Sequence, residues 1–357
     1  MSQCYRSLKS ELPREYFKPQ GFRLFSIIFL LLLGFGLIAT MVVVPMAWFF
    51  KIPLSLIVGY CWAVNGLLGH ELMHGSIVRK KSLQNFFGFF CFLPFMISPT
   101  FWRYWHNNLH HSHTQRNIMD PDAYPTYRIY KQSRFMQWMF PFTPGSGYKR
   151  SYLYFFFWFT FNVQVAQFYF RFRNRTFDKL DHKKVNKEIA VLLSIHLLGL
   201  VAVGPMNWFW VCVIPFLVQN YIPFSYISTN HNLSPLTKEN DPLVNSLTVT
   251  NHPILEFLHV QFGYHVEHHL FPTVSGVHLK SIHKVLKERY PEKYLCMPKW
   301  RAIKALYKTA RIYKNPTTLY NPITGATYPT LVARTTPAQS DQSTVIVSPE
   351  PLSPPTL

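Results

Sequence analysis

Charged residues are scarce in this chain, and acidic ones are the scarcest. Asp, Glu, Lys and Arg make up 15% of the 357 residues, against about 25% in an ordinary soluble domain. Apolar residues take their place: they form 48% of the chain, aromatic residues form 17%, and both gather in long uninterrupted runs. This composition argues against a soluble protein with a large core and indicates a membrane protein.

Cysteine is also rare. The five cysteines are scattered and form no CxxC pair, which argues against a redox motif or a zinc ribbon. We therefore interpret them as reduced and structural.

The shortage of acidic residues leaves a strong basic excess. The 36 Lys and Arg outnumber the 16 Asp and Glu, so the formal charge is +20. Nucleic-acid binding is one source of such an excess, but here the basic residues flank apolar segments. That placement favours membrane lipids and cytoplasmic loops, not nucleic acid, as their partners.

The first half of the chain predicts one membrane hairpin. Residues 1–23 are polar and basic, and we assign them to the cytoplasm. Uncharged runs at 24–46 and 52–69 each have about the length that a helix needs to cross a bilayer. The basic cluster Arg79-Lys80-Lys81 follows the second run, and such clusters favour the cytoplasm. The hairpin therefore begins and ends inside.

The second half predicts another hairpin and two segments that do not cross. If residues 83–99 crossed, the histidines on either side would face opposite leaflets, so we expect a re-entrant or interfacial segment. The loop 171–187 has seven Lys and Arg against two Asp and should be cytoplasmic. The aromatic run 152–170 then lies on the membrane surface, and runs 189–206 and 208–226 form the hairpin.

The expected architecture is an all-α integral membrane protein with about four spans, interfacial helices and a cytoplasmic histidine-rich cap. A cytoplasmic segment (1–23) precedes a membrane domain (24–315). Residues 280–314 carry eleven Lys and Arg against two Glu, which suits a cap lying on headgroups. The segment 316–357 is rich in Pro, Ser and Thr, and we expect a flexible tail there.

Half of the 16 histidines fall in three short clusters, each at the end of an apolar segment. Residues four apart lie on one face of an α-helix, so each cluster can present its imidazoles together. Neutral imidazole is a ligand for Fe, Zn, Cu and Ni, and eight nitrogen donors are enough for two ions. The clusters are His70 and His74; His106, His110 and His111; and His265, His268 and His269.

Two known kinds of metal site fit less well. A soluble carboxylate-bridged di-iron bundle needs inward Glu residues on four helices, which the sequence lacks. The first cluster alone also reads His-Glu-x-x-His, the signature of a zinc peptidase. A membrane zinc peptidase is therefore an alternative, but it leaves the other two clusters unexplained.

In the order HxxxH, HxxxHH and HxxHH, with spans between the first and last, the three clusters resemble the membrane-bound fatty acid desaturase and hydroxylase superfamily. The second continues as His110-His111-Ser112-His113-Thr114, and the third reads Gly-Tyr-His-Val-Glu-His-His-Leu-Phe-Pro from Gly263. The third is similar to that of acyl-lipid desaturases without a fused cytochrome b5 domain. The resemblance covers roughly residues 25 to 315.

The resemblance implies that all eight histidines bind two iron ions. A ninth ligand commonly lies between the last span and the third cluster, where His231 is the first candidate and His252 its rival. His113 is extra to the family spacing, and we expect a structural role for it. Candidates to hold the ligands in place by hydrogen bonds are Glu71, Asp120, Asp122, Asn230 and Glu267.

The implied activity is that of an oxidoreductase, an O2-dependent fatty acyl desaturase that forms a cis double bond. The alternative with the same ligands is a hydroxylase or ketolase of a lipid or carotenoid. No His-Pro-Gly-Gly haem motif is present, so the resemblance implies a separate electron donor, ferredoxin or cytochrome b5. Residues 55–68 and 208–225 are expected to line the acyl slot. A bacterial or cyanobacterial membrane fits these features better than the endoplasmic reticulum.

Overall fold

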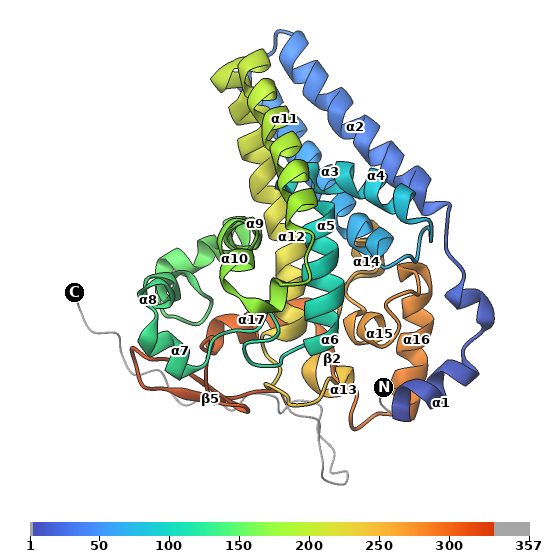
Figure 1. The fold of residues 1–357 in the computed structure, drawn as a ribbon, viewed down its shortest axis with the longest axis vertical. Helices are drawn as coiled ribbons and strands as arrows, with labels where there is room; N and C mark the ends of the chain where they lie inside the picture. Colours follow the sequence, from blue (N-terminus) through green and yellow to red (C-terminus); the bar gives the residue numbers. More distant parts are fainter. Residues whose placement is uncertain (1–2, 332–357) are drawn as a thin grey trace.

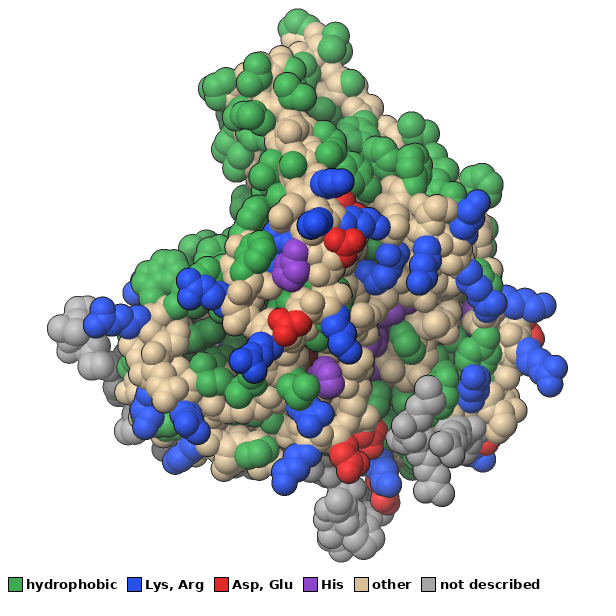
Figure 2. Space-filling view, viewed as in Figure 1, with side chains coloured by type: hydrophobic (Ala, Val, Ile, Leu, Met, Phe, Trp, Pro, Cys, Tyr) green, Lys and Arg blue, Asp and Glu red, His purple; other side chains and the backbone are tan. Residues whose placement is uncertain are grey.

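The computed structural model describes residues 3–331, and these are mostly helical (Figure 1). The predicted all-α membrane class is confirmed. A tall column of long helices stands on a broad base of short helices and two small sheets. In Figure 2, apolar side chains cover the column, whereas Lys, Arg, Asp and Glu gather over the base. This division fits a column within the membrane and a base at its surface.

Two helical hairpins form the column. The first is α2 (Arg23–Val43) and α3 (Trp48–Met73), and both are long and apolar enough to cross a membrane. The second is the helical stretch His182–His231, made of α11 (His182–Trp208), η8 (Phe209–Val213) and α12 (Ile214–His231). The four predicted spans correspond to α2, α3, α11 and the η8–α12 leg.

The second hairpin turns at Gly204, where the backbone takes a positive φ of 75°. Such a φ costs glycine little, since it has no Cβ. The rings of His196 and Trp208 lie 5.8 Å apart, although twelve residues of straight helix would separate them by about 18 Å. The chain therefore reverses here, as the Gly-Pro pair predicted.

Helices α3 and α12 pack closely in the centre of the molecule. A Cβ on Gly59 would lie 2.7 Å from both the Pro215 carbonyl oxygen and the Val218 Cβ. Helix α3 is followed directly by His74 and α12 ends at His231. The close contact therefore brings the carboxyl ends of two membrane helices together at the base.

The segment between the hairpins is bent, which fits the expected re-entrant or interfacial segment. It consists of α4 (Lys81–Phe92), η2 (Leu93–Phe95), α5 (Pro99–Trp102), η3 (Arg103–His110) and α6 (His111–His113). Its two halves meet at an angle of 98°. The bend directs the second histidine cluster back toward the first.

The aromatic run predicted for the membrane surface forms α9 (Tyr154–Val165) and η6 (Ala166–Phe170). It does not qualify as a membrane span by length and hydropathy. One face packs on α12, where Tyr154 lies against Phe224 with ring centroids 4.9 Å apart. Its place at the membrane surface stays a prediction.

The base holds the remaining helices and two sheets. Strand β1 (Thr248–Thr250) pairs in parallel with β2 (Cys296–Pro298). Strands β3 (Ile312–Asn315), β4 (Thr318–Tyr320) and β5 (Thr327–Pro329) form an antiparallel sheet. The helices are α1 (Gln3–Glu11), η1 (Arg14–Phe17), α7 (Tyr127–Gln132), α8 (Arg134–Met139), η4 (Phe140–Phe142), η5 (Lys149–Leu153), α10 (Arg171–Arg173), η7 (Arg175–Phe177), α13 (Pro242–Asn245), α14 (Pro253–Leu258), α15 (His265–Leu270), α16 (Gly276–Arg289) and α17 (Lys299–Lys308).

Strands β4 and β5 correct the predicted start of the flexible tail. A flexible tail was expected from residue 316, but residues 318–320 and 327–329 are strands of the β3–β4–β5 sheet. Leu319 and Tyr313 of this sheet are buried together with Leu236, which holds the sheet to the base. The rest of the expected tail, 332–357, lies outside the described residues.

Candidate metal centre

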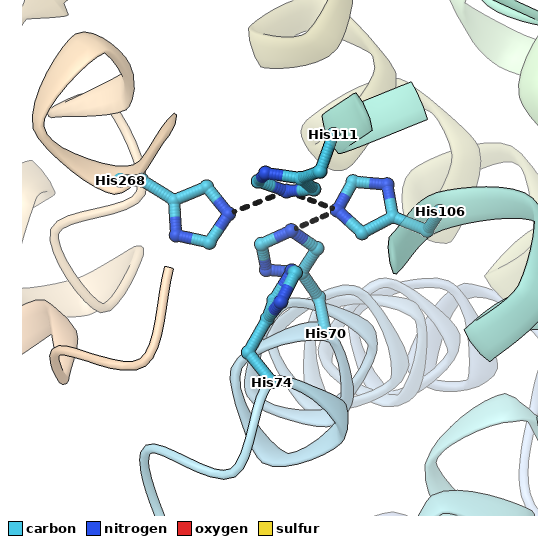
Figure 3. Close-up of side chains that lie close together, drawn as sticks. All are labelled: His70, His74, His106, His111 and His268. Carbon is cyan, nitrogen blue, oxygen red and sulfur yellow. Dashed lines mark hydrogen bonds between the residues drawn. The ribbon is translucent and has the colours of Figure 1, made fainter. Parts of the chain in front are cut away.

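Nine histidines converge at the base of the column in two adjacent groups. Within each group the ring nitrogens that face one another all lie within 4.8 Å. The first group is His70, His74, His106, His111 and His268, shown in Figure 3. The second is His110, His231, His265 and His269.

The Nε2 atoms point toward one another within each group. In the first, His106 Nε2 lies 2.7 Å from His70 Nε2 and 3.0 Å from His111 Nε2, as the dashed lines of Figure 3 show. In the second, His265 Nε2 lies 2.7 Å from His231 Nε2 and 3.1 Å from His269 Nε2. The groups adjoin, because the His111 and His269 rings stack at 4.2 Å.

The second histidine cluster divides between the groups, and this corrects the sequence analysis. An α-helix would place His106 and His110 on one face. Instead, η3 is a π-helix, and the His111 N–H donates to the His106 carbonyl five residues earlier. This i to i+5 pattern aligns His106 with His111, and His110 joins the second group. The His110 ring still stacks on His106 at 5.2 Å, and these two with Asp122 form a third, overlapping set of possible ligands.

The other elements supply the remaining nitrogens. Helix α3 contributes only to the first group and α12 only to the second, whereas the short helix α15 contributes to both. The structure brings His231 into the second group. The rival His252 is exposed and caps α14, where its Nδ1 accepts from the Ile254 N–H. His113 belongs to neither group.

Asp120 is the candidate carboxylate that contacts a clustered histidine most directly. The His110 Nδ1–H donates to Asp120 Oδ1 at 2.9 Å, and the Gln115 N–H donates to Oδ2 at 2.7 Å. This contact leaves His110 Nε2 free as a ligand atom. Asp122 lies farther, with Oδ2 at 3.4 Å from the same Nδ1, and burial raises the pKa of Asp122 to about 6.

Two further residues hold the histidines, and the sequence analysis did not single out either. The Thr114 hydroxyl donates to the His110 carbonyl at 2.8 Å, so the His269 Nδ1–H is the donor in their 3.3 Å contact. The Asn245 carbonyl accepts from the His231 Nδ1–H at 3.4 Å, and the Asn245 side chain donates to the Thr114 carbonyl at 3.1 Å. Thr114 ends the stretch His110-His111-Ser112-His113-Thr114 that resembles the family, which could have pointed to it, whereas no motif marks Asn245.

Two predicted supporting carboxylates lie elsewhere. Glu71 accepts from Arg23, from the Ser275 hydroxyl and from the Gly276 N–H, so it joins α2, α3 and the first turn of α16. Glu267 accepts from the Thr248 hydroxyl at 2.6 Å and also from Tyr294. Both carboxylates fasten the scaffold around the groups and do not touch the nine histidines.

Asn230, the last of the predicted supports, is fully buried beside His231, and neither atom of its amide has a hydrogen-bond partner. It therefore makes no side-chain hydrogen bond to any of the clustered histidines.

The donor set suits two transition-metal ions. Burial and then the neighbouring imidazoles lower the pKa values of His265, His268 and His269 well below that of an ordinary histidine. These rings are therefore neutral at physiological pH, the form that binds metal. Five and four imidazoles in two adjacent groups are enough to hold two transition-metal ions, with one ion in each group.

A mostly apolar pocket lies directly beneath the histidines. His70, His106, His110, His231 and His265 form its roof. Gly66 and Leu67 of α3, Pro223 and Phe224 of α12, and the aromatic residues Phe92, Phe95, Trp102, Trp105, Phe159 and Phe262 line its walls. The lining agrees in part with the expected slot between the spans: α3 and α12 contribute to it, but η2, α5, η3 and α9 do so as well.

Comparison with known proteins agrees with this arrangement. A sequence model of the family described as fatty acid desaturase matches residues 46–300. The omega-6 fatty acid desaturase of Spinacia oleracea chloroplasts is 20% identical over 328 residues, which are 86% of this chain and 69% of that protein.

A relative from Synechocystis is more similar. It is named sn-1 acyl-lipid omega-3 desaturase (ferredoxin), and it is 24% identical over 334 residues, 87% of this chain and 88% of its own length. The sn-1 oleoyl-lipid 12-desaturase of Picosynechococcus is 28% identical over 118 residues, a third of each chain. The match of the family model over most of the length, together with the histidine groups, shows that the chain belongs to the fatty acid desaturase family and is an oxidoreductase of membrane lipid metabolism.

Proposed function

We propose that this protein is an acyl-lipid desaturase that uses O2 to place a cis double bond in a fatty acyl chain at a histidine-bound di-iron centre. The observation that carries the proposal is the apolar cavity whose roof consists of histidines from both groups. An acyl chain in that cavity would lie directly against the metal site. The acyl-lipid substrates named for the relatives support the choice of substrate.

The nine histidines would hold the two ions, His70, His74, His106, His111 and His268 around one and His110, His231, His265 and His269 around the other. Bound iron would supply the oxidising chemistry that an unactivated methylene requires and that side-chain acids and bases lack. Asp120 and Thr114 would keep His110 and His269 in the ligating tautomer.

The cavity walls have two further tasks. Trp102 stacks on His106 with ring planes 9° apart, and Phe262 meets the edge of His70. These rings close the roof against water and fix the faces of the imidazoles. An acyl chain bound below them is held in an apolar slot at a fixed distance from the histidines.

We propose ferredoxin or cytochrome b5 as the electron donor. It would dock from the cytoplasm on the Lys- and Arg-rich surface at the base of the molecule. Both are acidic partners that a basic surface would attract. The Synechocystis relative has ferredoxin in its name. On this proposal the base and its histidine groups face the cytoplasm, in a bacterial or cyanobacterial membrane.

The zinc-peptidase alternative loses its main support. In a His-Glu-x-x-His peptidase the Glu acts as a base at the metal. Here both oxygens of Glu71 are engaged by Arg23, Ser275 and the Gly276 N–H. Glu71 is therefore a structural link between helices.

The first experiment compares His231→Ala with His252→Ala. The purified wild-type protein should contain about two irons, and its host should gain a cis double bond in its lipids only when O2 is present. His231→Ala should lose most activity and part of the iron, because it removes one of four nitrogens from the second group. His252→Ala should retain both, since His252 only caps α14.

The measurements are metal analysis and mass spectrometry of fatty acids with double-bond location. One zinc in place of two irons, or full activity in His231→Ala, would contradict the proposal. A hydroxylated or ketolated product would redirect it to the alternative chemistry of the same site.

A further inference from the structure

A second apolar cavity lies between the two hairpins. Its walls come from α2, α3, α11, η8 and α12, with Phe35, Trp62, Val203, Trp208, Val211 and Gln219 among them. None of the nine histidines lines it. The proposed reaction assigns it no role.

The second cavity is stacked beyond the first, away from the histidines. On α3, Trp62 lines the second cavity and Gly66 the first; on α12, Gln219 lines the second and Pro223 the first. Each pair is one helical turn apart, about 6 Å along the axis. On both helices the second cavity is the one farther from the terminal histidine.

A thin partition separates the two cavities, and it is the short helix η2. Phe95 lines the first cavity, whereas Leu93 and Pro94 line the second. The Phe95 ring is buried and rests on α3, where a Cβ at Gly66 would lie 2.9 Å from it. Phe95 therefore forms the floor of the cavity beneath the histidines.

The partition is held in place by side chains of four neighbouring elements: α9, η6, α11 and α12. His196 donates to the Leu93 carbonyl at 2.9 Å, Gln219 to the Pro94 carbonyl at 2.8 Å and Gln164 to the Phe95 carbonyl at 2.8 Å. Gln167 donates to the Met96 carbonyl at 3.1 Å, where φ is positive and the chain bends. Irregular backbone at membrane depth persists only when its polar groups are satisfied in this way.

We propose that Phe95 determines the position of the double bond by stopping the methyl end of the acyl chain. This inference rests on the proposed function and adds the residue that sets its regioselectivity. The chain must enter methyl end first, because a polar head cannot be buried without partners on a floor of aromatic rings. The distance from Phe95 to the histidines then selects the carbon pair that reacts.

The test replaces Phe95 with Ala and with Leu in a host that supplies acyl chains of several lengths. A smaller side chain at position 95 should open the first cavity into the second, so the methyl end of the acyl chain should move farther from the histidines. The double bond in most of the product should then shift by at least one carbon toward the carboxyl end, more in Phe95→Ala than in Phe95→Leu. Longer chains should also be accepted better than by the wild type.

Two further variants make the test specific. Phe86 on α4 is 56% exposed, so Phe86→Ala is a matched change away from both cavities and should leave the product unchanged. Val203 lines the second cavity, so Val203→Phe added to Phe95→Leu should stop the chain again and move the double bond back toward its original position. The readout is double-bond location by mass spectrometry, with iron content as a check of folding.

The outcomes separate this inference from the proposed function. An unchanged double bond in Phe95→Leu, with normal iron and activity, would overturn the role of Phe95 alone. Should Phe95→Ala fail to accumulate, Phe95→Leu and its Val203→Phe combination still decide. If the wild-type chain makes no double bond, the proposed function fails and this inference fails with it.

Discussion

Single side chains around the histidines do as much to shape the site as the histidines themselves. Asp120 accepts a hydrogen bond from the His110 Nδ1–H with one carboxylate oxygen and from the Gln115 N–H with the other. Gln115 in turn donates to the His231 carbonyl. One carboxylate therefore connects the loop after the second histidine cluster with the end of α12.

We expect Asp120→Asn to weaken iron binding about 10- to 100-fold, as is typical when the hydrogen-bond partner of a ligating histidine is changed. The amide keeps the shape of the carboxylate but removes its charge. The measurement is a competition for iron with a chelator of known affinity. Asp181→Asn is the control, because Asp181 only caps α11 by accepting from the Lys184 N–H. Equal iron affinity in both variants would contradict the role of Asp120.

For single residues, the sequence predicts which histidines belong to the site better than it predicts which side chains contact them. The types and spacing of eight histidines marked them in advance, and the family resemblance added His231 as the first candidate for a ninth. Their division into groups was not predictable, because it depends on a π-helical hydrogen bond from His111 to His106 that no local pattern announces. Glu71 and Glu267 were misassigned for a related reason: adjacency in sequence to a histidine says nothing of the direction in which a carboxylate points.

Among the elements, the α3–α12 pair has the greatest effect on the site. Helix α3 contributes His70 to the first group and α12 contributes His231 to the second, so the separation of the helices affects the separation of these two histidines. The helices are close because Gly59 leaves room for the backbone of Pro215. The hydrophobic runs predicted both helices, but their contact needed the three-dimensional packing of a small residue.

Gly59→Val should therefore lower iron content and activity more than its small change in volume suggests. The added side chain meets backbone that cannot rotate away, so the helices must move apart. Gly36→Val in α2 is the matched control, because no atom lies within 4 Å of a Cβ at that position. The measurements are the thermal unfolding midpoint in detergent and the iron content of the two variants. Similar values for both would show that helix contact at Gly59 does not position the histidines.

The described part of the molecule is polarised along the column: apolar side chains cover the column in Figure 2, and the nine histidines gather at the base, where α3 and α12 end. Charge and hydropathy in the sequence predicted this polarity, as well as the return of the bent segment to the base. The sheet of β3, β4 and β5 was missed, because short strands in a Pro- and Thr-rich region carry little hydrophobic pattern. The two hairpin turns also meet: the Lys51 ammonium donates to the Asn207 side chain at 3.0 Å.

This polarity makes a prediction about sidedness. Helix α2 has 21 residues, about 31 Å at 1.5 Å per residue, which matches the hydrocarbon thickness of a bilayer. Lys51, at the turn of the first hairpin, should therefore face the opposite side of the membrane from Lys284 on α16 of the base. In intact cells a membrane-impermeant maleimide should label Lys51→Cys and leave Lys284→Cys unlabelled.

Permeabilised cells should allow both sites to react, and the unsubstituted chain measures the background from the native cysteines, of which Cys61 and Cys91 are buried. Labelling of both variants at equal rates in intact cells would contradict a two-hairpin column that spans the membrane. Labelling of Lys284→Cys alone would keep the column but reverse its orientation. In that case the histidine groups would face away from the cytoplasm, and a cytoplasmic electron donor could not reach them.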